Sequence, residues 1–354
     1  MVDNIRLIDV TKRFGEVTAV NRLNLEIKQG ECFSFLGPSG CGKTTTLRML
    51  AGFEDLDEGE MYVGDTLVSS SVKKYYLPPE KRGFGMVFQA FAVWPHMNVY
   101  ENVAFPLRVK KISREEVDRR TREALANTRL AGLERSFPGE LSGGQQQRIA
   151  LARAIALNPR VLLLDEPLSN LDPHNRESMR FEIKDLQRQL GVTILFVTHD
   201  QSEAMALSDR MLVMKDGVVQ QVDTPVNIYY NPANRFVFSF IGLSNFVPVE
   251  MADGKVHVGG AKDAGFIGKQ TQIDKSVFSS HKAVAAFRPS DVVFGETGSI
   301  GGKIVRRTFL GELVDYKVKV GEHDIRVQKN RRDVQLKEGD TCRMDFRRIL
   351  WYER

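Results

Sequence analysis

The sequence lacks any apolar run of the roughly 18 residues that a membrane-spanning helix needs. The best candidate, Phe236 to Val249, is interrupted by Ser239, Gly242, Ser244 and Asn245. The first residues contain no basic segment followed by an apolar core, so a secretion signal is not expected either. These two absences count against an integral helical membrane protein and against a secreted protein.

Cysteine is also scarce, with three among the 354 residues. Cys32, Cys41 and Cys342 do not have the spacing of metal ligands, and so few cysteines suit a reducing cytosol. The formal net charge is +5, but the sequence contains no run of five or more like charges. An excess of basic residues can indicate a protein that binds nucleic acid or an anionic membrane surface. Here the scattered Lys and Arg residues favour solvated helix faces, and no nucleic-acid partner is expected.

A chain of this length favours two domains, and the residue pattern changes near position 240. Residues 1–238 alternate between strand and helix patterns, which predicts an α/β domain. Ile5 to Val10 and Leu23 to Ile27 alternate apolar and polar residues, as expected of edge strands in an antiparallel lobe. Val161 to Leu164 and Thr193 to Val197 are apolar runs, typical of parallel strands that are covered on both faces.

Two further regions complete the predicted architecture. In residues 90–158 the apolar residues recur at helical spacing. A first helix begins at the capping box Ser113 to Glu116, and a second is expected from about Gly144 to Ala156. This region predicts a helical subdomain inserted into the α/β core. Residues 239–354 contain short alternating segments between turn-forming clusters, which predict a small all-β domain of the OB-like barrel type. Its expected strands are Ala283–Phe287, Lys303–Phe309, Leu313–Val320, Asp324–Gln328 and Thr341–Phe346.

The loop from Gly37 to Thr44 reads Gly-Pro-Ser-Gly-Cys-Gly-Lys-Thr, the G-x-x-x-x-G-K-T spacing of a phosphate-binding loop. It follows a predicted buried strand, Cys32 to Leu36, and opens a predicted helix, Lys43 to about Ala51, and this context counts against a chance match. Backbone N–H groups and the helix dipole would bind phosphate oxygens. Lys43 would neutralise the β- and γ-phosphates of a nucleotide, and Thr44 would ligate Mg²⁺. The other expected contacts of the loop are Ser39, Gly40, Cys41, Gly42 and Thr45.

Cys41 lies among the amides of this loop, where a thiolate would be favoured. We expect it to be a bystander in nucleotide binding. Alkylation of its thiol would nevertheless block the nucleotide, because the added group would fill the loop.

An acidic pair, Asp165 and Glu166, follows the apolar run Val161 to Leu164. An acid at a strand end can hold Mg²⁺ through water, which suits Asp165, and Glu166 is placed to polarise an attacking water as general base. Paired acids also end many strands, and Pro167 could simply terminate this one. Together with the glycine loop, the pair predicts a nucleotide-hydrolysing site at the carboxyl ends of the strands.

A third motif, Leu141-Ser-Gly-Gly-Gln-Gln-Gln-Arg148, resembles the signature sequence of ABC ATPases. With the two nucleotide motifs, it makes the chain similar to the ATP-binding subunits of ABC importers, in the subgroup with a C-terminal regulatory domain. The maltose, ferric-iron and polyamine importer ATPases belong to this subgroup. The resemblance covers essentially the whole chain and is dense in motifs over residues 5–225. It implies a homodimer in which Ser142, Gly144 and Gln145 contact the ATP that the partner holds.

The resemblance also implies roles for single residues. Phe14 falls where an aromatic ring stacks on adenine, with a core phenylalanine as the alternative. Gln89 would touch Mg²⁺ and the attacking water, and His199 would fix the γ-phosphate and the water. A lone histidine at a strand end is more often structural or exposed. Asp172 belongs to the loop that crosses the dimer interface beside Glu166.

The partners implied by the resemblance are two transmembrane permease subunits and, indirectly, a solute-binding protein. The permease would be contacted through the Gln89 loop and the apolar segment Phe91 to Met97. Ordinary packing of the helical subdomain explains that segment equally well. The implied location is the cytoplasmic face of the inner membrane, as a peripheral subunit. Phe287 to Asp291 resembles the arginine-proline element of the family's C-terminal domain, which could sense a ligand, bind a regulator or steady the dimer.

The expected function is ATP hydrolysis that closes and reopens a homodimer and thereby powers solute import. A P-loop kinase or GTPase would have no use for Leu141 to Gln145. An ABC protein of DNA repair or translation would carry a long coiled-coil insertion or a second nucleotide domain, and an exporter usually fuses its ATPase to a membrane domain. Near the start of the C-terminal domain the chain reads Gly242-Leu-Ser-Asn-Phe246. This sequence resembles that of the ferric-iron, polyamine or phosphonate importer ATPases more than that of the sugar importer ATPases. A sugar-importer ATPase and a non-transport ABC ATPase are the alternatives.

Overall fold

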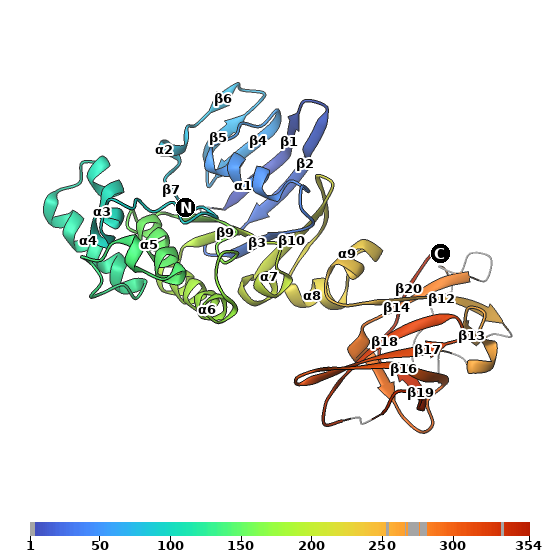
Figure 1. The fold of residues 1–354 in the computed structure, drawn as a ribbon. Coiled ribbons are helices and arrows are strands. Elements are labelled where there is room, and N and C mark those ends of the chain that lie inside the picture. The colour runs from blue at the N-terminus through green and yellow to red at the C-terminus, as the bar shows by residue number, and fades with distance from the viewer. Residues whose placement is uncertain (1–3, 253–254, 266, 268–275, 277–281, 334–335) are drawn as a thin grey trace. The chain divides into compact units, whose positions relative to one another are not determined.

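The computed structural model describes residues 4–252, 255–265, 267, 276, 282–333 and 336–354 (Figure 1). The chain forms two compact units, Met1–Val237 and Phe238–Arg354, and each unit has hydrophobic cores of its own. The division falls beside the boundary predicted at residues 238–239. Among the described residues, no helix is long and apolar enough to cross a membrane.

The first unit begins with a five-stranded antiparallel sheet in the order β2-β1-β4-β5-β6. The prediction that the first strand is an edge strand was wrong, because β1 pairs with β2 on one side and with β4 on the other. The strand that covers it was missed because β4 has a single fully buried apolar residue, Met61, and no alternating pattern. The strands are β1 (Ile5–Phe14), β2 (Val17–Ile27), β4 (Glu58–Val63), β5 (Thr66–Ser70) and β6 (Tyr75–Tyr76).

A six-stranded sheet forms the centre of the first unit, in the order β11-β10-β3-β9-β8-β7. Neighbouring residues of β8 alternate between two cores: Val161 and Leu163 belong to one cluster, and Leu162 and Leu164 to the other. Both faces of the sheet are therefore covered, which explains the continuous apolar runs. Its parallel strands are β3 (Cys32–Leu36), β7 (Phe84–Val87), β8 (Val161–Asp165), β9 (Thr193–Val197) and β10 (Arg210–Lys215), and β11 (Val218–Asp223) is antiparallel to β10.

Helices cover both faces of this central sheet. Helix α1 (Lys43–Ala51) shares one core with β1, β2 and the central strands, through Leu47 and Leu50. The other core holds α3 (Val99–Val109), α4 (Arg114–Asn127), α5 (Gly143–Ile155) and α6 (Pro173–Leu190). Figure 1 shows α3, α4 and α5 grouped at one end of the unit. This group confirms the predicted helical insertion. Shorter helices of this unit are α2 (Pro79–Arg82), α7 (Gln201–Leu207) and α8 (Pro225–Tyr230), and α9 (Arg235–Phe240) spans the division between the two units.

The described residues of the second unit form two antiparallel sheets, which confirms the predicted all-β class. Their orders are β13-β12-β14-β20 and β15-β19-β16-β17-β18, and side chains of both sheets form one core. The five predicted strands correspond to β14 (Lys282–Phe287), β16 (Ile300–Leu310), β17 (Leu313–Val320), β18 (His323–Asn330) and β19 (Thr341–Phe346). Four strands were missed: β12 (Asn245–Ala252), β13 (Lys255–Val258), β15 (Val292–Phe294) and β20 (Leu350–Tyr352).

Arg288, from the arginine-proline element, is buried inside the second unit. Its Nη1 donates to the carbonyl oxygens of Phe238 at 3.0 Å and Leu243 at 3.1 Å. The guanidinium carbon lies 4.0 Å from the centroid of the Phe238 ring. These contacts fix the segment that leads into β12, so the element has a structural task in the start of this unit.

Candidate nucleotide site

The predicted catalytic residues meet at the carboxyl edge of the central sheet. Strand β3 leads into the glycine loop, β7 into Phe88 and Gln89, β8 into Glu166, and β9 into Thr198 and His199. These four strands are parallel neighbours in the sheet. The loops that follow them therefore emerge at one edge, where open α/β sheets place their functional groups.

The glycine loop packs tightly against the strands beside it. Gly40 and Gly42 have φ values of 78° and 105°, in the left-handed region. A Cβ on Gly42 would lie 2.2 Å from the carbonyl oxygen of Ala19, and one on Gly37 would lie 2.2 Å from that of Met214. Glycine is therefore required at both positions. Helix α1 starts directly after Gly42, so its first N–H groups are available to an anion.

Lys43 is folded back onto the loop that carries it. Its Nζ donates to the carbonyl oxygens of Gly37 at 2.7 Å and Pro38 at 2.8 Å, and lies 3.6 Å from Cys41 Sγ. Burial raises the pKa of the Cys41 thiol, against the opposing effect of the Lys43 ammonium. The predicted preference for a thiolate was wrong, because desolvation outweighs the ammonium and the nearby amides.

Thr44 and Asp165 meet between helix α1 and strand β8. Thr44 Oγ1 donates to Asp165 Oδ1 at 3.4 Å. Burial raises the pKa of the Asp165 carboxyl, with Arg48 opposing the shift and Glu166 adding to it. A hydroxyl and a carboxylate are the oxygen donors that Mg²⁺ prefers, so the pair fits the predicted metal. Over the described part of the chain, no group of three His, Cys, Asp or Glu side chains could hold a metal.

Glu166 contacts the two other predicted catalytic residues. Its Oε2 accepts a hydrogen bond from Gln89 Nε2 at 3.1 Å, and its Oε1 lies 3.3 Å from His199 Nδ1. Glu166 has a φ of 46°, a conformation that residues other than glycine rarely adopt, and its N–H donates to the carbonyl of Val197 at 3.0 Å. Strain of this kind collects at functional sites, where the surrounding structure fixes the residue.

Ser142, Gly144 and Gln145 lie at the start of helix α5, which opens with a complete capping box. Ser142 Oγ accepts from the Gln145 N–H at 3.3 Å, and Gln145 Oε1 accepts from the Ser142 N–H at 2.9 Å. Ser142 is exposed at this helix N-terminus, where the dipole favours an anion. Among the hydrogen bonds of the described residues, none joins these three to the glycine loop of the same chain.

Asp172 caps helix α6 and belongs to a loop that also contacts Gln89. Its carboxylate accepts from the Asn175 N–H at 3.1 Å and from Asn175 Nδ2 at 2.5 Å, and these bonds lower its pKa. In the same loop, Asn170 Nδ2 donates to the backbone carbonyl of Gln89 at 2.7 Å. Sequence reasoning missed this link, because nothing in the pattern pairs two residues so far apart in the chain.

Phe14 ends strand β1 with its ring about half exposed. Lys12 Nζ lies 5.2 Å from the ring centroid. Phe14 is therefore not a core residue, which removes the alternative considered from the sequence. The adjoining strand β2 contacts the glycine loop, through the approach of Ala19 to Gly42.

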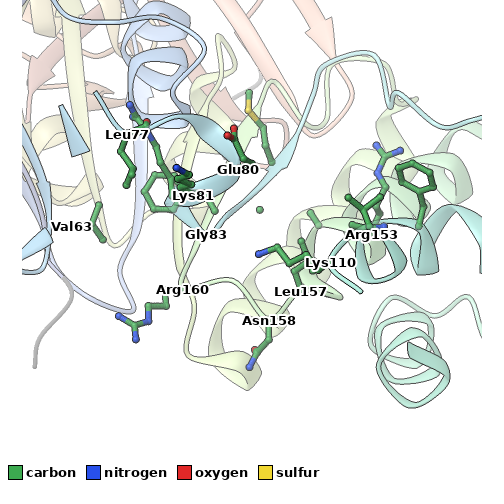
Figure 2. A pocket seen from close by; sticks show the side chains of 18 of the residues that line it. Val63, Leu77, Glu80, Lys81, Gly83, Lys110, Arg153, Leu157, Asn158 and Arg160 are labelled. Atoms are coloured by element: carbon green, nitrogen blue, oxygen red, sulfur yellow. The ribbon is translucent and has the colours of Figure 1, made fainter. Parts of the chain in front are cut away.

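A cavity of about 820 Å³ lies beside the end of strand β7 (Figure 2). It is lined by residues of α2, β7, α3 and α5 and by part of the predicted apolar segment Phe91 to Met97. Ala92 and Trp94 of that segment line it, together with Phe88 and Phe105. The Trp94 and Phe105 rings pack with centroids 4.6 Å apart. The segment is thus a wall of a cavity as well as part of the subdomain packing.

Arg153, on helix α5, holds this wall in place and was missed by sequence reasoning. Its Nη1 donates to the Ala92 carbonyl at 2.6 Å and its Nη2 to the Phe91 carbonyl at 3.2 Å. Its guanidinium carbon lies 4.6 Å from the centroid of the Trp94 ring. The available signal was a single arginine in an otherwise apolar stretch of the helix, Ile149 to Ile155.

Comparisons with known proteins show which family the chain belongs to. The ABC transporter family matches residues 20–169. The trehalose/maltose import ATP-binding protein MalK of Thermococcus litoralis is 53% identical, over 74% of this chain and 69% of its own. The spermidine/putrescine import ATP-binding protein PotA of Rubrobacter xylanophilus is 46% identical, over 88% of this chain and 82% of its own.

A solved structure gives the same result for the fold. The ATP-binding cassette MJ0796, in a dimeric post-hydrolysis state bound to ADP and phosphate, is 35% identical with a TM-score of 0.54. The match covers 62% of this chain and 98% of that one. The chain therefore belongs to the ABC transporter family, among the ATP-binding subunits of importers of the maltose and polyamine subgroup, and is an ATPase coupled to transport.

Proposed function

We propose that two copies of this chain close around ATP, and that closing and reopening drive two permease subunits to import a small solute. The observation that supports this most strongly is the position of Glu166, which contacts both Gln89 and His199 at the carboxyl edge of the sheet. Ser142, by contrast, is exposed on a separate helix and has no described hydrogen bond to the glycine loop of its own chain. This separation suits a site that two copies share.

ATP would displace the hydrogen bonds that now hold Lys43. Two neutral carbonyls, of Gly37 and Pro38, accept from its ammonium. A triphosphate carries several negative charges and forms stronger, charge-assisted bonds with an ammonium. Lys43 would therefore turn to the β- and γ-phosphates, with backbone N–H groups of Ser39 to Thr45 completing the cradle. Phe14 would stack on the adenine.

Thr44, Asp165 and Gln89 would hold Mg²⁺ through oxygen atoms. The bound ion supplies positive charge that neutralises the phosphates. The Thr44 hydroxyl is already 3.4 Å from the Asp165 carboxylate, so the two ligands need little movement to share one ion.

Glu166 would polarise the water that attacks the γ-phosphate. Its side chain is 21% exposed, so water reaches it, and the neighbouring Gln89 and His199 restrict where that water sits. The backbone strain at Glu166 fixes the direction of its side chain. The contacts of Glu166 with Gln89 and His199 support these proposed roles of a base and two orienting groups.

Dimer closure would depend on the γ-phosphate. Helix α5 points its positive N-terminus outward, and Ser142, Gly144 and Gln145 at this end would bind the ATP held by the partner. Without an anion between them, the two chains have little reason to close. Hydrolysis and phosphate release remove the shared anion, and the dimer reopens. The Asp172 loop would cross the interface in the same closure.

The permease would dock at the cavity beside β7. Its wall is apolar and aromatic, with Phe88, Trp94 and Phe105. Lys110 and Arg160 add positive charge at the same cavity, where Figure 2 shows their side chains. Such a site fits an amphipathic helix with acidic residues from a membrane subunit. Asn170 links the Gln89 backbone to the dimer loop, so closure would move this site.

The proposed solute is a small molecule of the polyamine type, since the relatives named for spermidine and putrescine import match most of this chain. A sugar is the alternative, because a relative named for trehalose and maltose import is 53% identical. The proposed location is the cytoplasmic face of the membrane, bound to the permease. The second unit, Phe238–Arg354, is proposed as a regulatory domain.

The Glu166→Gln variant tests dimer closure. It keeps the shape of the site but lacks the base, so ATP persists and the closed dimer accumulates. With ATP and Mg²⁺ the variant should elute as a dimer in size-exclusion chromatography, and with ADP as a monomer. Adding Ser142→Arg to the same chain should keep it monomeric with ATP. A Glu166→Gln chain that stays monomeric at saturating ATP would contradict the proposal.

A further inference from the structure

Glu182, in the middle of helix α6, is a buried carboxylate that the mechanism above does not use. Its side chain is 7% exposed. Its Oε2 accepts from Arg148 Nε at 2.9 Å, and its Oε1 accepts from Arg148 Nη2 at 2.6 Å and from Arg129 Nη1 at 3.0 Å. Arg148 therefore binds through two parallel bonds, the geometry that restricts orientation most strongly. One carboxylate joins α6 to α5 and to the segment that follows α4.

Helices α5 and α6 meet at a second point nearer their N-termini. A Cβ on Gly144 would lie 3.5 Å from the side chain of Asn175, so the two helices approach each other closely there. Arg148 is about one turn beyond Gly144, and Glu182 is about two turns beyond Asn175. Two separated contacts fix both the distance and the rotation of one helix relative to the other.

Both helices begin with a residue that is proposed to face the partner chain. Ser142 caps α5, and Asp172 caps α6. We infer that Glu182 is a positioning residue for the shared ATP site, which holds α5 against α6 so that Ser142 and Asp172 reach the partner as one rigid unit. This inference depends on the proposed closure of two chains around ATP.

Charge makes this contact hard to replace. In the Glu182→Gln variant one neutral amide oxygen would face three N–H donors from Arg148 and Arg129, and its own NH₂ group would oppose them. Arg148, 21% exposed, would lose its counter-charge. Apolar packing in the core that α5 shares with α6 would remain. Without the two-bond contact, however, the N-terminal end of α5 could shift against α6. A displacement of about 1 Å in a positioned group can cost about 10²-fold in function.

The test introduces Glu182→Gln into the Glu166→Gln chain and measures two quantities. The first is the ATP concentration at half-maximal dimer formation with Mg²⁺, measured by analytical ultracentrifugation. The second is the affinity of the single chain for a fluorescent ATP analogue, at protein concentrations too low for dimers. We expect the first to rise at least about tenfold, because the partner-facing group is displaced. The second should change less than about twofold, because the glycine loop is a separate site.

Two further variants separate positioning from general stability. Lys184 lies on the same helix, α6, and its Nζ is 2.7 Å from the carboxylate of Asp209. Lys184→Met removes this ion pair and should leave the dimerisation midpoint unchanged. Arg148→Lys keeps the charge but cannot form the two-bond fork, and should give an intermediate midpoint.

The outcomes distinguish the two proposals. If the Glu166→Gln parent does not dimerise with ATP, dimer closure itself fails and the inference fails with it. If the parent dimerises and the added Glu182→Gln change lowers only the melting temperature, with an unchanged midpoint, Glu182 has a structural role alone and only the inference is overturned. If the Glu182→Gln chain does not fold, Arg148→Lys decides, and an unchanged midpoint there overturns the inference.

Discussion

At the scale of single residues, Gly42 meets the strictest geometric demand in the site. It combines a φ of 105° with a carbonyl oxygen 2.2 Å from the position of a Cβ. Gly42→Ala should therefore destabilise the fold by about 3 kcal/mol, from strain plus steric clash, and abolish nucleotide binding. Chemical unfolding measures the first effect.

Gly132→Ala is the matched control for this change. Gly132 has a φ of 90°, but nothing lies within 4 Å of the added Cβ. It should cost only about 1 kcal/mol, from backbone strain alone. Equal losses in the two variants would show that the packing of Ala19 against the glycine loop does not matter.

Thiol chemistry is a second property set by single residues. Burial raises the pKa of Cys32 to about 12 and of Cys342 to about 11, and it raises the pKa of Cys41. A raised pKa lowers the thiolate fraction at neutral pH. At pH values below the pKa, that fraction grows about tenfold for each unit by which the pH rises. Reaction of the folded chain with Ellman's reagent should be slow at neutral pH, accelerate with rising pH, and be fast after unfolding. Rapid modification of the folded chain at neutral pH would contradict this.

The sequence was most informative about these residues where the pattern is local. The glycine loop and the Asp165-Glu166 pair are each defined by a strand and the few residues after it, so their type and place could be predicted. The state of Cys41 could not be predicted, because it depends on desolvation by surrounding segments. The conformation of Lys43 was equally hidden, because the pattern does not show that the carbonyls of Gly37 and Pro38 accept hydrogen bonds from its ammonium.

At the scale of elements, helix α5 supports the wall of the cavity through Arg153. Arg153→Met keeps much of the side-chain volume but removes the bonds to two backbone carbonyls. Because hydrogen bonds from charged groups contribute about 1.5–3 kcal/mol, permease binding should weaken about tenfold or more. ATPase activity of the free subunit should change less than about twofold. Co-purification of the expressed complex and a phosphate-release assay measure the two effects.

Arg119→Met provides the comparison for this prediction. Arg119 is an exposed arginine on α4 that pairs with Glu116 and Glu123. Its loss should leave both permease binding and ATPase activity unchanged, since surface ion pairs contribute little. If Arg153→Met also leaves the complex intact, the cavity is not the docking site.

Elements with strong periodicity could be predicted from the sequence, and those defined by pairing could not. Helices α4 and α5 and strands β3, β8 and β9 have clear patterns and lie close to their predicted bounds. The interior position of β1 became visible only through its pairing with β4, in which Met61 is the one fully buried residue. The contact between Glu182 and Arg148 was hidden for the same reason, because it joins two helices through side chains distant in sequence.

At the scale of the whole molecule, the two units have separate cores, and this predicts two unfolding steps. The glycine loop and Asp165 belong to the first unit, so ATP with Mg²⁺ should stabilise that unit alone. At a ligand concentration of about 100 Kd the expected gain is about 2.7 kcal/mol. Differential scanning calorimetry should show two transitions, of which one moves upward with nucleotide. A single transition that moves as a whole would show that the units unfold together.

Closure of two chains around ATP is the central claim at this scale, and a crystal structure of the Glu166→Gln chain with ATP and Mg²⁺ tests it most directly. The account predicts two copies in which the γ-phosphate of each ATP contacts Lys43 of one chain and Ser142 of the other. ATP bound by Lys43 with Ser142 of both chains facing solvent would contradict the account, as would contact of both residues with ATP from within a single chain.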